Sequence, residues 1–300
     1  MNSPQPAPEP EASLLHRLLV ASAAAARLPA PFVALALAAL SALAGLVWAA
    51  RTHSGGEALA AGLLLFTACL LNWGLLAALP RAGRSFGSPV APALALGLLL
   101  TGGALLLALL PALILLIGWL AGVTAIAAYA TWIAPFQIEV THESLTAKGL
   151  SRPLRIVHIG DLHVERITAR ERRLNQLLES LQADVIVFSG DFVNLTYRDD
   201  LRAEADVRAV IAGWHAPYGV YAVPGTPLVE PLERVRAFVR DLPSITLLLN
   251  QWQTVETPAG TLLIAGLITT HHLPADRAAL AGLARRRPAV DGLRLLLTHS

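Results

Sequence analysis

The first part of the chain is a succession of long apolar runs that contain no charged residue. Twenty-three uncharged residues separate Arg27 from Arg51, and another 23 separate Glu57 from Arg81. An α-helix rises about 1.5 Å per residue, so about 20 residues are enough to cross the ~30 Å hydrocarbon core of a membrane. Each of these two runs therefore predicts one membrane-spanning helix.

The next apolar stretch is too long for a single span. No charged residue occurs from Phe86 to Ile138, and the strongly apolar part, 89–136, would form one helix about 70 Å long. Pro111 is the expected break, because proline lacks an amide donor and disrupts the preceding helical turn. The pattern thus predicts four spans, at about 31–50, 58–80, 91–110 and 113–134.

From Gln137 onward the pattern changes to short apolar runs that alternate with charged, amphipathic segments. Short runs of branched apolar residues predict strands, and apolar residues at a period of 3.6 predict helices. We expect strands at 154–159, 184–188, 219–223, 245–249, 253–256, 261–265 and 293–298, and helices at 168–181, 199–212, 232–242 and 274–285. This alternation predicts an α/β layered domain, with mixed β-sheets flanked by helices.

Charge is distributed as unevenly as hydropathy. Only eight of the 44 charged residues lie in 1–136, and charged residues make up 15% of the chain against about 25% in typical soluble domains. This excludes a single soluble globule, a disordered chain and a polycationic nucleic-acid binder, so no nucleic-acid partner is expected. We predict a disordered tail and short interfacial helix over 1–28, a four-helix transmembrane module over 29–136, and the α/β domain over 137–300.

The basic residues beside the spans predict an orientation. Arg17, Arg27, Arg81 and Arg84 fall on one side of the predicted bundle, and Arg51 falls on the other. The positive-inside rule then places both termini and the α/β domain in the cytoplasm, on a multi-pass protein of the cell membrane. The spans contain no acid, lysine or arginine, which favours an anchor in the lipid bilayer over a transporter or sensor.

Polar side chains suited to metal binding follow three of the expected strands. Asp161 and His163 come after the first strand, Asp191 after the second, and His299 after the last. Ligands of open α/β sheets bind beyond the carboxyl ends of the strands, so these side chains are expected to converge. Singly, each carboxylate is equally consistent with a cap or a turn, and each histidine with a surface residue. Together they predict a site for Mn, Fe, Zn or a similar divalent ion.

These segments resemble the calcineurin-like metallophosphoesterases, in particular the membrane-anchored bacterial type. The resemblance extends from about Leu154 to Ser300, roughly half of the chain. It rests on four segments: RIVHIGDLH at 155–163, VIVFSGDF at 185–192, YGVYAVPG at 218–225 and LLLTH at 295–299.

The resemblance implies a centre of two divalent metal ions. Asp161 and His163 would bind the first ion, Asp191 would bridge both, and His299 would bind the second. The implied reaction is hydrolysis of a phosphate ester by attack of a metal-bound hydroxide. The implied partners are the lipid bilayer and a phosphorylated substrate, with a lipid-linked substrate as one option.

Two departures from the family pattern leave a non-catalytic alternative open. The family has Gly-Asn-His-Asp/Glu after its third strand, whereas residues 225–228 read Gly-Thr-Pro-Leu, so a metal-binding Asn and a His are replaced. Glu230 or Asn194 is a candidate replacement ligand. The family's last motif, Gly-His-x-His, lies beyond the equivalent of His299, so the domain is expected to be truncated at Ser300. The alternative is a diverged protein of the same fold that binds a metal or a phosphorylated ligand without catalysis.

Overall fold

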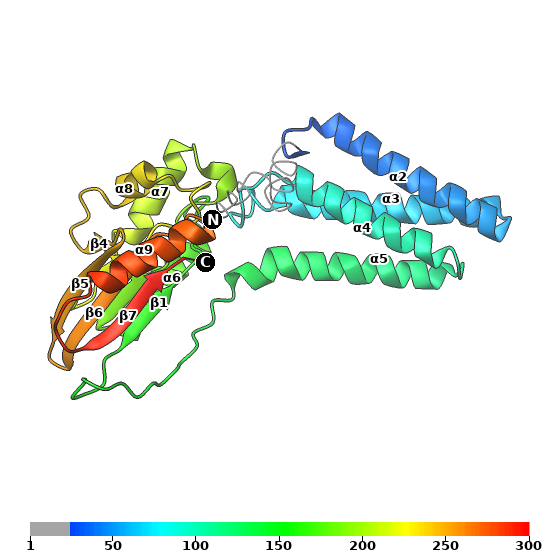
Figure 1. The fold of residues 1–300 in the computed structure, drawn as a ribbon. Helices are drawn as coiled ribbons and strands as arrows, with labels where there is room; N and C mark the ends of the chain where they lie inside the picture. Colours follow the sequence, from blue (N-terminus) through cyan, green and yellow to red (C-terminus); the bar gives the residue numbers. More distant parts are fainter. Residues whose placement is uncertain (1–24, 300) are drawn as a thin grey trace, which may run out of the picture. The chain divides into compact units, whose positions relative to one another are not determined.

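The computed structural model describes residues 25–299, which fall into two compact units (Figure 1). One unit ends at Ile138 and the other begins at Glu139. The tail and interfacial helix predicted over 1–28 lie almost wholly outside the described residues, as does Ser300.

The first unit consists of four long apolar helices. They are α2 (Ala30–Thr52), α3 (Gly55–Ala78), α4 (Val90–Leu107) and α5 (Leu113–Ala128). The last helix continues through a π-helical turn (Tyr129–Ile133) and a 3-10 turn (Ala134–Phe136). All four are long and apolar enough to cross a membrane, which confirms the predicted four-helix module. Pro111 lies in the turn between α4 and α5, where the break was expected.

Two polar side chains of this unit form hydrogen bonds between neighbouring helices. The Trp48 indole of α2 donates a hydrogen bond to the Ala104 carbonyl of α4, at 2.9 Å. The Asn72 amide of α3 donates to the Thr124 hydroxyl of α5, at 2.8 Å. The outer faces expose large apolar side chains, including Ile114 at 73%. Hydrogen bonds between the helices and apolar side chains on the outside suit a bundle surrounded by lipid.

The second unit contains two β-sheets. The first is parallel in the order β1 (Ile156–Ile159), β2 (Val185–Phe188), β3 (Val220–Ala222) and β4 (Ile245–Leu247). The second consists of β5 (Gln251–Thr257), β6 (Gly260–Leu267) and β7 (Leu293–Thr298). In this sheet β5 and β6 are antiparallel, and β6 and β7 are parallel. All seven predicted strands are present, which confirms the mixed β-sheets.

Four helices flank the sheets, at the predicted places. They are α6 (Ala169–Leu181), α7 (Leu201–Ile211), α8 (Leu232–Val239) and α9 (Leu273–Arg285). The first three pack on one face of the parallel sheet, and α9 packs on β6 of the second sheet (Figure 1).

Strand β2 illustrates how the layers are joined. Its side chains alternate, so that Ile186 and Phe188 pack into the core shared with α6–α8. Val185 and Val187 face the opposite way and pack with residues of the second sheet, such as Ile264. All four side chains of β2 are buried, as expected for a parallel strand that is covered on both faces. The domain is therefore layered as helices, sheet, sheet and helix.

The register of the parallel sheet brings the ends of its strands together. Ile159 at the end of β1 lies beside Phe188 of β2, which in turn lies beside Ala222 of β3. The loops that follow these strands consequently leave the sheet at one edge, where the predicted ligands begin.

Candidate metal centre

The loops after β1 and β2 are hydrogen-bonded to each other along their backbones. The amide of Asp161 donates to the carbonyl of Gly190 at 3.2 Å, and the amide of His163 donates to the carbonyl of Asp191 at 2.9 Å. These bonds continue the pairing of the two strands beyond the sheet. They hold Asp161 and His163 directly beside Asp191.

Three of the predicted ligands form one cluster. Asp161, His163 and Asp191 each present a ligand atom, and these atoms all lie within 4.8 Å of one another. His163 Nε2 is 3.5 Å from Asp191 Oδ2. The three residues adopt left-handed backbone conformations, with φ of 52°, 46° and 59°. Such conformations are uncommon outside glycine, and they concentrate at sites where function dictates the backbone.

The fourth predicted ligand joins this cluster from the second sheet. His299 directly follows β7, and its Nε2 lies 3.6 Å from Asp191 Oδ2. Its Nδ1 lies 3.0 Å from the Ser189 carbonyl, which can only accept a hydrogen bond. Nδ1 therefore carries a proton, and in the neutral ring Nε2, which faces Asp191, has the lone pair with which histidines ligate metals. The structure thus brings all four predicted residues together around one carboxylate.

Thr226, to which the sequence assigned no role, also contacts this carboxylate. Its backbone amide donates to Asp191 Oδ1 at 2.7 Å, and its Oγ1 lies 3.3 Å from Asp191 Oδ2. The same Oγ1 is 3.3 Å from His299 Nε2. Thr226 stands where the family pattern has its metal-binding Asn. This position in the motif is the feature of the sequence that could have indicated a role for Thr226 in the site.

Close approach of two backbones sets the position of Asp191. A Cβ on Gly225 would lie 2.1 Å from the Asp191 nitrogen and 2.2 Å from its Oδ1. A Cβ on Gly190 would lie 2.4 Å from the Gly225 nitrogen, and Gly190 has a φ of +93°. Only glycine fits at these two positions, because any side chain would push the loops after β2 and β3 apart.

The two candidate replacement ligands bond to the surrounding loops. Glu230 is 1% exposed, and its Oε1 and Oε2 accept hydrogen bonds from the amides of Val193 (2.9 Å) and Gly225 (3.3 Å). Asn194 Oδ1 caps a 3-10 turn by accepting from the Thr196 amide. The structure therefore places Glu230 as a support beneath the loops of Asp191 and Thr226.

Burial gives the Glu230 carboxyl an unusual affinity for protons. Burial, reinforced by the nearby Asp191 carboxylate, raises the pKa of Glu230 from 4.5 to about 7, although backbone amides of Val193, Gly225 and Phe192 act in the opposite direction. The folded chain thus holds a proton that the unfolded chain releases between pH 5 and 7. Stability is highest below this window and decreases as the pH rises through it.

This titration leads to a testable pH dependence. At about 1.4 kcal/mol per pKa unit, the metal-free domain should lose roughly 2 kcal/mol of unfolding free energy between pH 5 and pH 7. Glu230→Gln should flatten this dependence, whereas Glu233→Gln, at an exposed position of α8, should leave it unchanged. Denaturant unfolding of the detergent-solubilised protein in EDTA measures the slope. An equal slope in wild type and Glu230→Gln would contradict this role of the carboxyl.

The start of α6 supports the loop that carries His163. The Arg170 guanidinium donates to the carbonyls of Leu162 (3.0 Å) and His163 (3.3 Å) and pairs with Glu171 at 2.7 Å. Glu171 also forms a capping box with Thr168. Burial raises the pKa of Glu171, but the Arg170 charge and the Thr168 hydrogen bonds outweigh it and leave the pKa below its usual value. The carboxylate therefore stays charged and keeps Arg170 in place.

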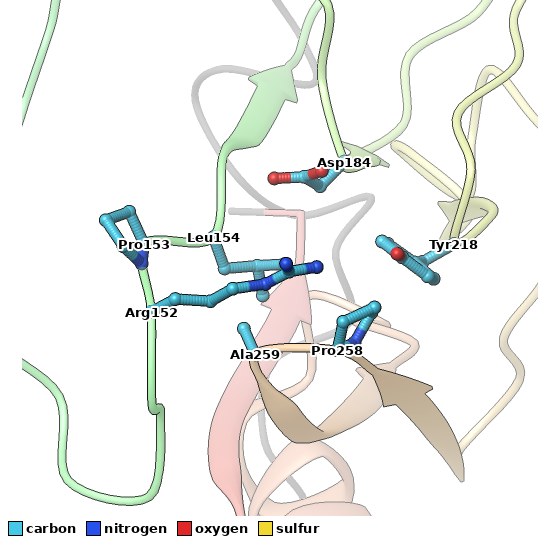
Figure 2. A pocket seen from close by; sticks show the side chains of 7 residues that line it. All are labelled: Arg152, Pro153, Leu154, Asp184, Tyr218, Pro258 and Ala259. Atoms are coloured by element: carbon cyan, nitrogen blue, oxygen red, sulfur yellow. The ribbon is translucent and has the colours of Figure 1, made fainter.

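A separate pocket lies at the opposite edge of the parallel sheet (Figure 2). It has a volume of about 230 Å³. Its lining residues precede β1, β2 and β3 or lie in the turn between β5 and β6: Arg152, Pro153, Leu154, Asp184, Tyr218, Pro258 and Ala259. This lining contains one carboxylate and no imidazole, so it offers fewer metal-ligating side chains than the cluster at the other edge.

Comparison with known proteins shows what the second unit is similar to. Residues 154–233, which include β1, β2, β3 and the loops of Asp161, Asp191 and Thr226, match the family model of the calcineurin-like phosphoesterases. Over these residues the second unit is similar to the calcineurin-like phosphoesterases. A Bacillus subtilis protein named uncharacterized metallophosphoesterase YkoQ is 28% identical to this chain over 152 residues. The aligned region covers 49% of this chain, and the chain spans about half the length of that relative, 53%.

The residues of the cluster suit the divalent metals that calcineurin-like phosphoesterases generally use. The cluster offers two carboxylates, Asp161 and Asp191, and two imidazoles, His163 and His299. Mixed nitrogen and oxygen donors match the preferences of Mn, Fe and Zn. The His299 tautomer, fixed by the Ser189 carbonyl, leaves a lone pair directed at the cluster.

Proposed function

We propose that this protein is a membrane-anchored, metal-dependent phosphoesterase. The observation that carries the proposal is the convergence of Asp161, His163 and His299 on the Asp191 carboxylate, at the edge where ligands of α/β sheets bind. The four apolar helices support the anchor.

The proposed chemistry divides between the metal ions and the residues of the chain. Divalent ions held by Asp161, His163, Asp191 and His299 would lower the pKa of a bound water and would offset the negative charge of a phosphate ester. Asp191 lies at the centre, because its Oδ1 is held by the Thr226 amide and its Oδ2 faces both imidazoles. The Ser189 carbonyl keeps His299 in the ligating tautomer. These residues bind and orient the reacting groups.

Pro227 stands where the family has a histidine that stabilises the transition state or protonates the leaving group. Without that imidazole, esters whose leaving group departs without a proton are favoured. We therefore propose that aryl phosphate esters are hydrolysed faster than alkyl esters of the same phosphate.

We further propose that the phosphoesterase domain lies on the cytoplasmic side of the cell membrane. The basic residues beside the spans support this orientation through the positive-inside rule. A domain tethered to the bilayer encounters lipid substrates at a high local concentration, so a lipid-linked phosphate ester is a natural substrate class.

Metal removal tests the proposed activity. Full-length protein in detergent is stripped with EDTA, reloaded with Mn²⁺ and assayed on bis(p-nitrophenyl) phosphate and p-nitrophenyl phosphate. We expect turnover of at least one ester with Mn²⁺ and its loss, by about 10³-fold or more, in EDTA, because activation of the water depends on the ion. Turnover that EDTA leaves unchanged would contradict the proposal.

The replacement of the family's Asn and His by Thr226 and Pro227 favours one other candidate, a non-catalytic protein that binds metal or a phosphorylated ligand. Tight Mn²⁺ binding without hydrolysis of either ester would support this second candidate over the first.

A further inference from the structure

We infer that the hydroxyl of Thr226 is a metal ligand, which supplies the oxygen that the family's Asn would otherwise provide. The hydroxyl would be a third ligand of a cation that Asp191 and His299 would also bind. This inference rests on the metal-dependent function proposed above and adds a residue to its site.

The spacing of three donor atoms is that of a coordination shell. Thr226 Oγ1 lies 3.3 Å from Asp191 Oδ2 and 3.3 Å from His299 Nε2, and these two atoms are 3.6 Å apart. Ligands bound at ~2.1 Å in a tetrahedral arrangement are about 3.4 Å from one another. The three atoms therefore form the face of a tetrahedron around a point that all three can reach.

The protons available at this face also favour a cation. Asp191 Oδ2 is an acceptor, and His299 Nε2 is an acceptor in the neutral ring, whose one proton lies on Nδ1 and is donated to the Ser189 carbonyl. The Thr226 hydroxyl has a single hydrogen to give, and it faces both acceptors. Its one hydrogen can serve only one of them at a time, whereas a divalent cation would be bound by lone pairs of all three atoms.

The backbone holds Thr226 in this position. Its amide is fixed by Asp191 Oδ1 at 2.7 Å, and the preceding Gly225 packs against Asp191 without room for a side chain. The following Pro227 restricts the backbone of Thr226, and a β-branched side chain has few χ1 rotamers. The hydroxyl is thus presented by a rigid segment.

A thiol at this position tests direct ligation. In Thr226→Cys, the sulfur would replace the hydroxyl oxygen, and soft Cd²⁺ should be bound more tightly than Mn²⁺ at the second site. We expect Cd²⁺ to produce a thiolate-to-metal charge-transfer band in the ultraviolet spectrum of Thr226→Cys. Wild type is the control, because its single cysteine, Cys69, is buried in the apolar unit.

Variants that keep or remove the side-chain oxygen complete the test. Calorimetry measures how many Mn²⁺ ions each variant binds and with what affinity. Thr226→Val keeps the shape but lacks the hydroxyl, and it should weaken the second ion about 10-fold or more while the first remains. Thr226→Ser and Thr226→Asn should keep both ions. If Cd²⁺ binds to Thr226→Cys without the band, or if Thr226→Val keeps both affinities, Thr226 is not a ligand and the proposed function stands. If wild type binds no ion, both proposals fail.

Discussion

Asp191→Asn should abolish metal binding and reduce phosphoesterase turnover by about 10³-fold or more, while the domain remains folded. Removing a group that only orients a metal ligand lowers metal affinity or activity by about 10- to 100-fold. Asp191 is the carboxylate that the other three predicted ligands surround, so its loss should lower them further. Asparagine keeps the oxygen that accepts from the Thr226 amide. It removes the charge that offsets the cations, and its amide nitrogen has no lone pair to donate to a metal.

The matched control for this variant lies at the other end of the same strand. Asp184 precedes β2, accepts a hydrogen bond from the Arg155 amide at 2.8 Å and lines the pocket of Figure 2. Asp184→Asn keeps that acceptor, so it should leave metal content and turnover close to wild type. Atomic absorption and ester hydrolysis measure both quantities. Asp191→Asn protein that retains its metal and its turnover would exclude Asp191 as the central ligand.

Gly225→Ala is expected to have the second large effect, through the shape of the site. The new Cβ would lie 2.1 Å from the backbone nitrogen of Asp191, which cannot move without separating the loops after β2 and β3. Overpacking against backbone costs about 3 kcal/mol or more when neighbours cannot yield. We expect a lower melting temperature and loss of Mn²⁺ binding, measured by thermal unfolding and calorimetry.

Gly282→Ala provides the comparison for this substitution. Gly282 lies within α9, and the nearest atom to its new Cβ would be an Arg286 side-chain nitrogen at 3.8 Å. Alanine in a helix is favoured over glycine by about 0.5–1 kcal/mol, so this variant should be neutral or slightly stabilised. Equal stability of the two variants would mean that Gly225 can move away from Asp191.

Much of the fold could be predicted from the sequence because single residue types determine the relevant boundaries. Charged residues bound the first two spans, and Pro111 separates α4 from α5. The pattern does not predict strand ends that are set by pairing with another strand. Strand β5 runs over Gln251–Thr257 rather than 253–256, because its polar end residues are held by pairing with β6 and not by an apolar pattern.

The π-helical turn that follows α5 was likewise absent from the prediction. Pro135 has no amide to donate, so the regular helical bonding cannot continue there, and the backbone widens over Tyr129–Ile133 before it. A proline in the sequence signals a disturbance of the helix, but the form that the disturbance takes depends on the surrounding packing.

Some residues of the site could likewise be predicted from the sequence, and others could not. The rule that ligands bind beyond the carboxyl ends of strands predicts from the sequence alone that Asp161, His163, Asp191 and His299 lie at one edge. The contributions of Thr226 and Glu230 include hydrogen bonds to residues 35 or more positions away, from the Thr226 amide to Asp191 and from the Val193 amide to Glu230. No local pattern marks such contacts, because they arise only when the loops after β2 and β3 pack together.

The most direct test of a metal centre at this edge is anomalous X-ray scattering from crystals loaded with Mn²⁺. We predict a manganese peak within bonding distance of an Asp191 carboxylate oxygen, with Asp161 and His163 as further ligands. A second peak is predicted on the side of His299. Manganese bound elsewhere in the domain, with these four side chains making no contact to it, would contradict the account.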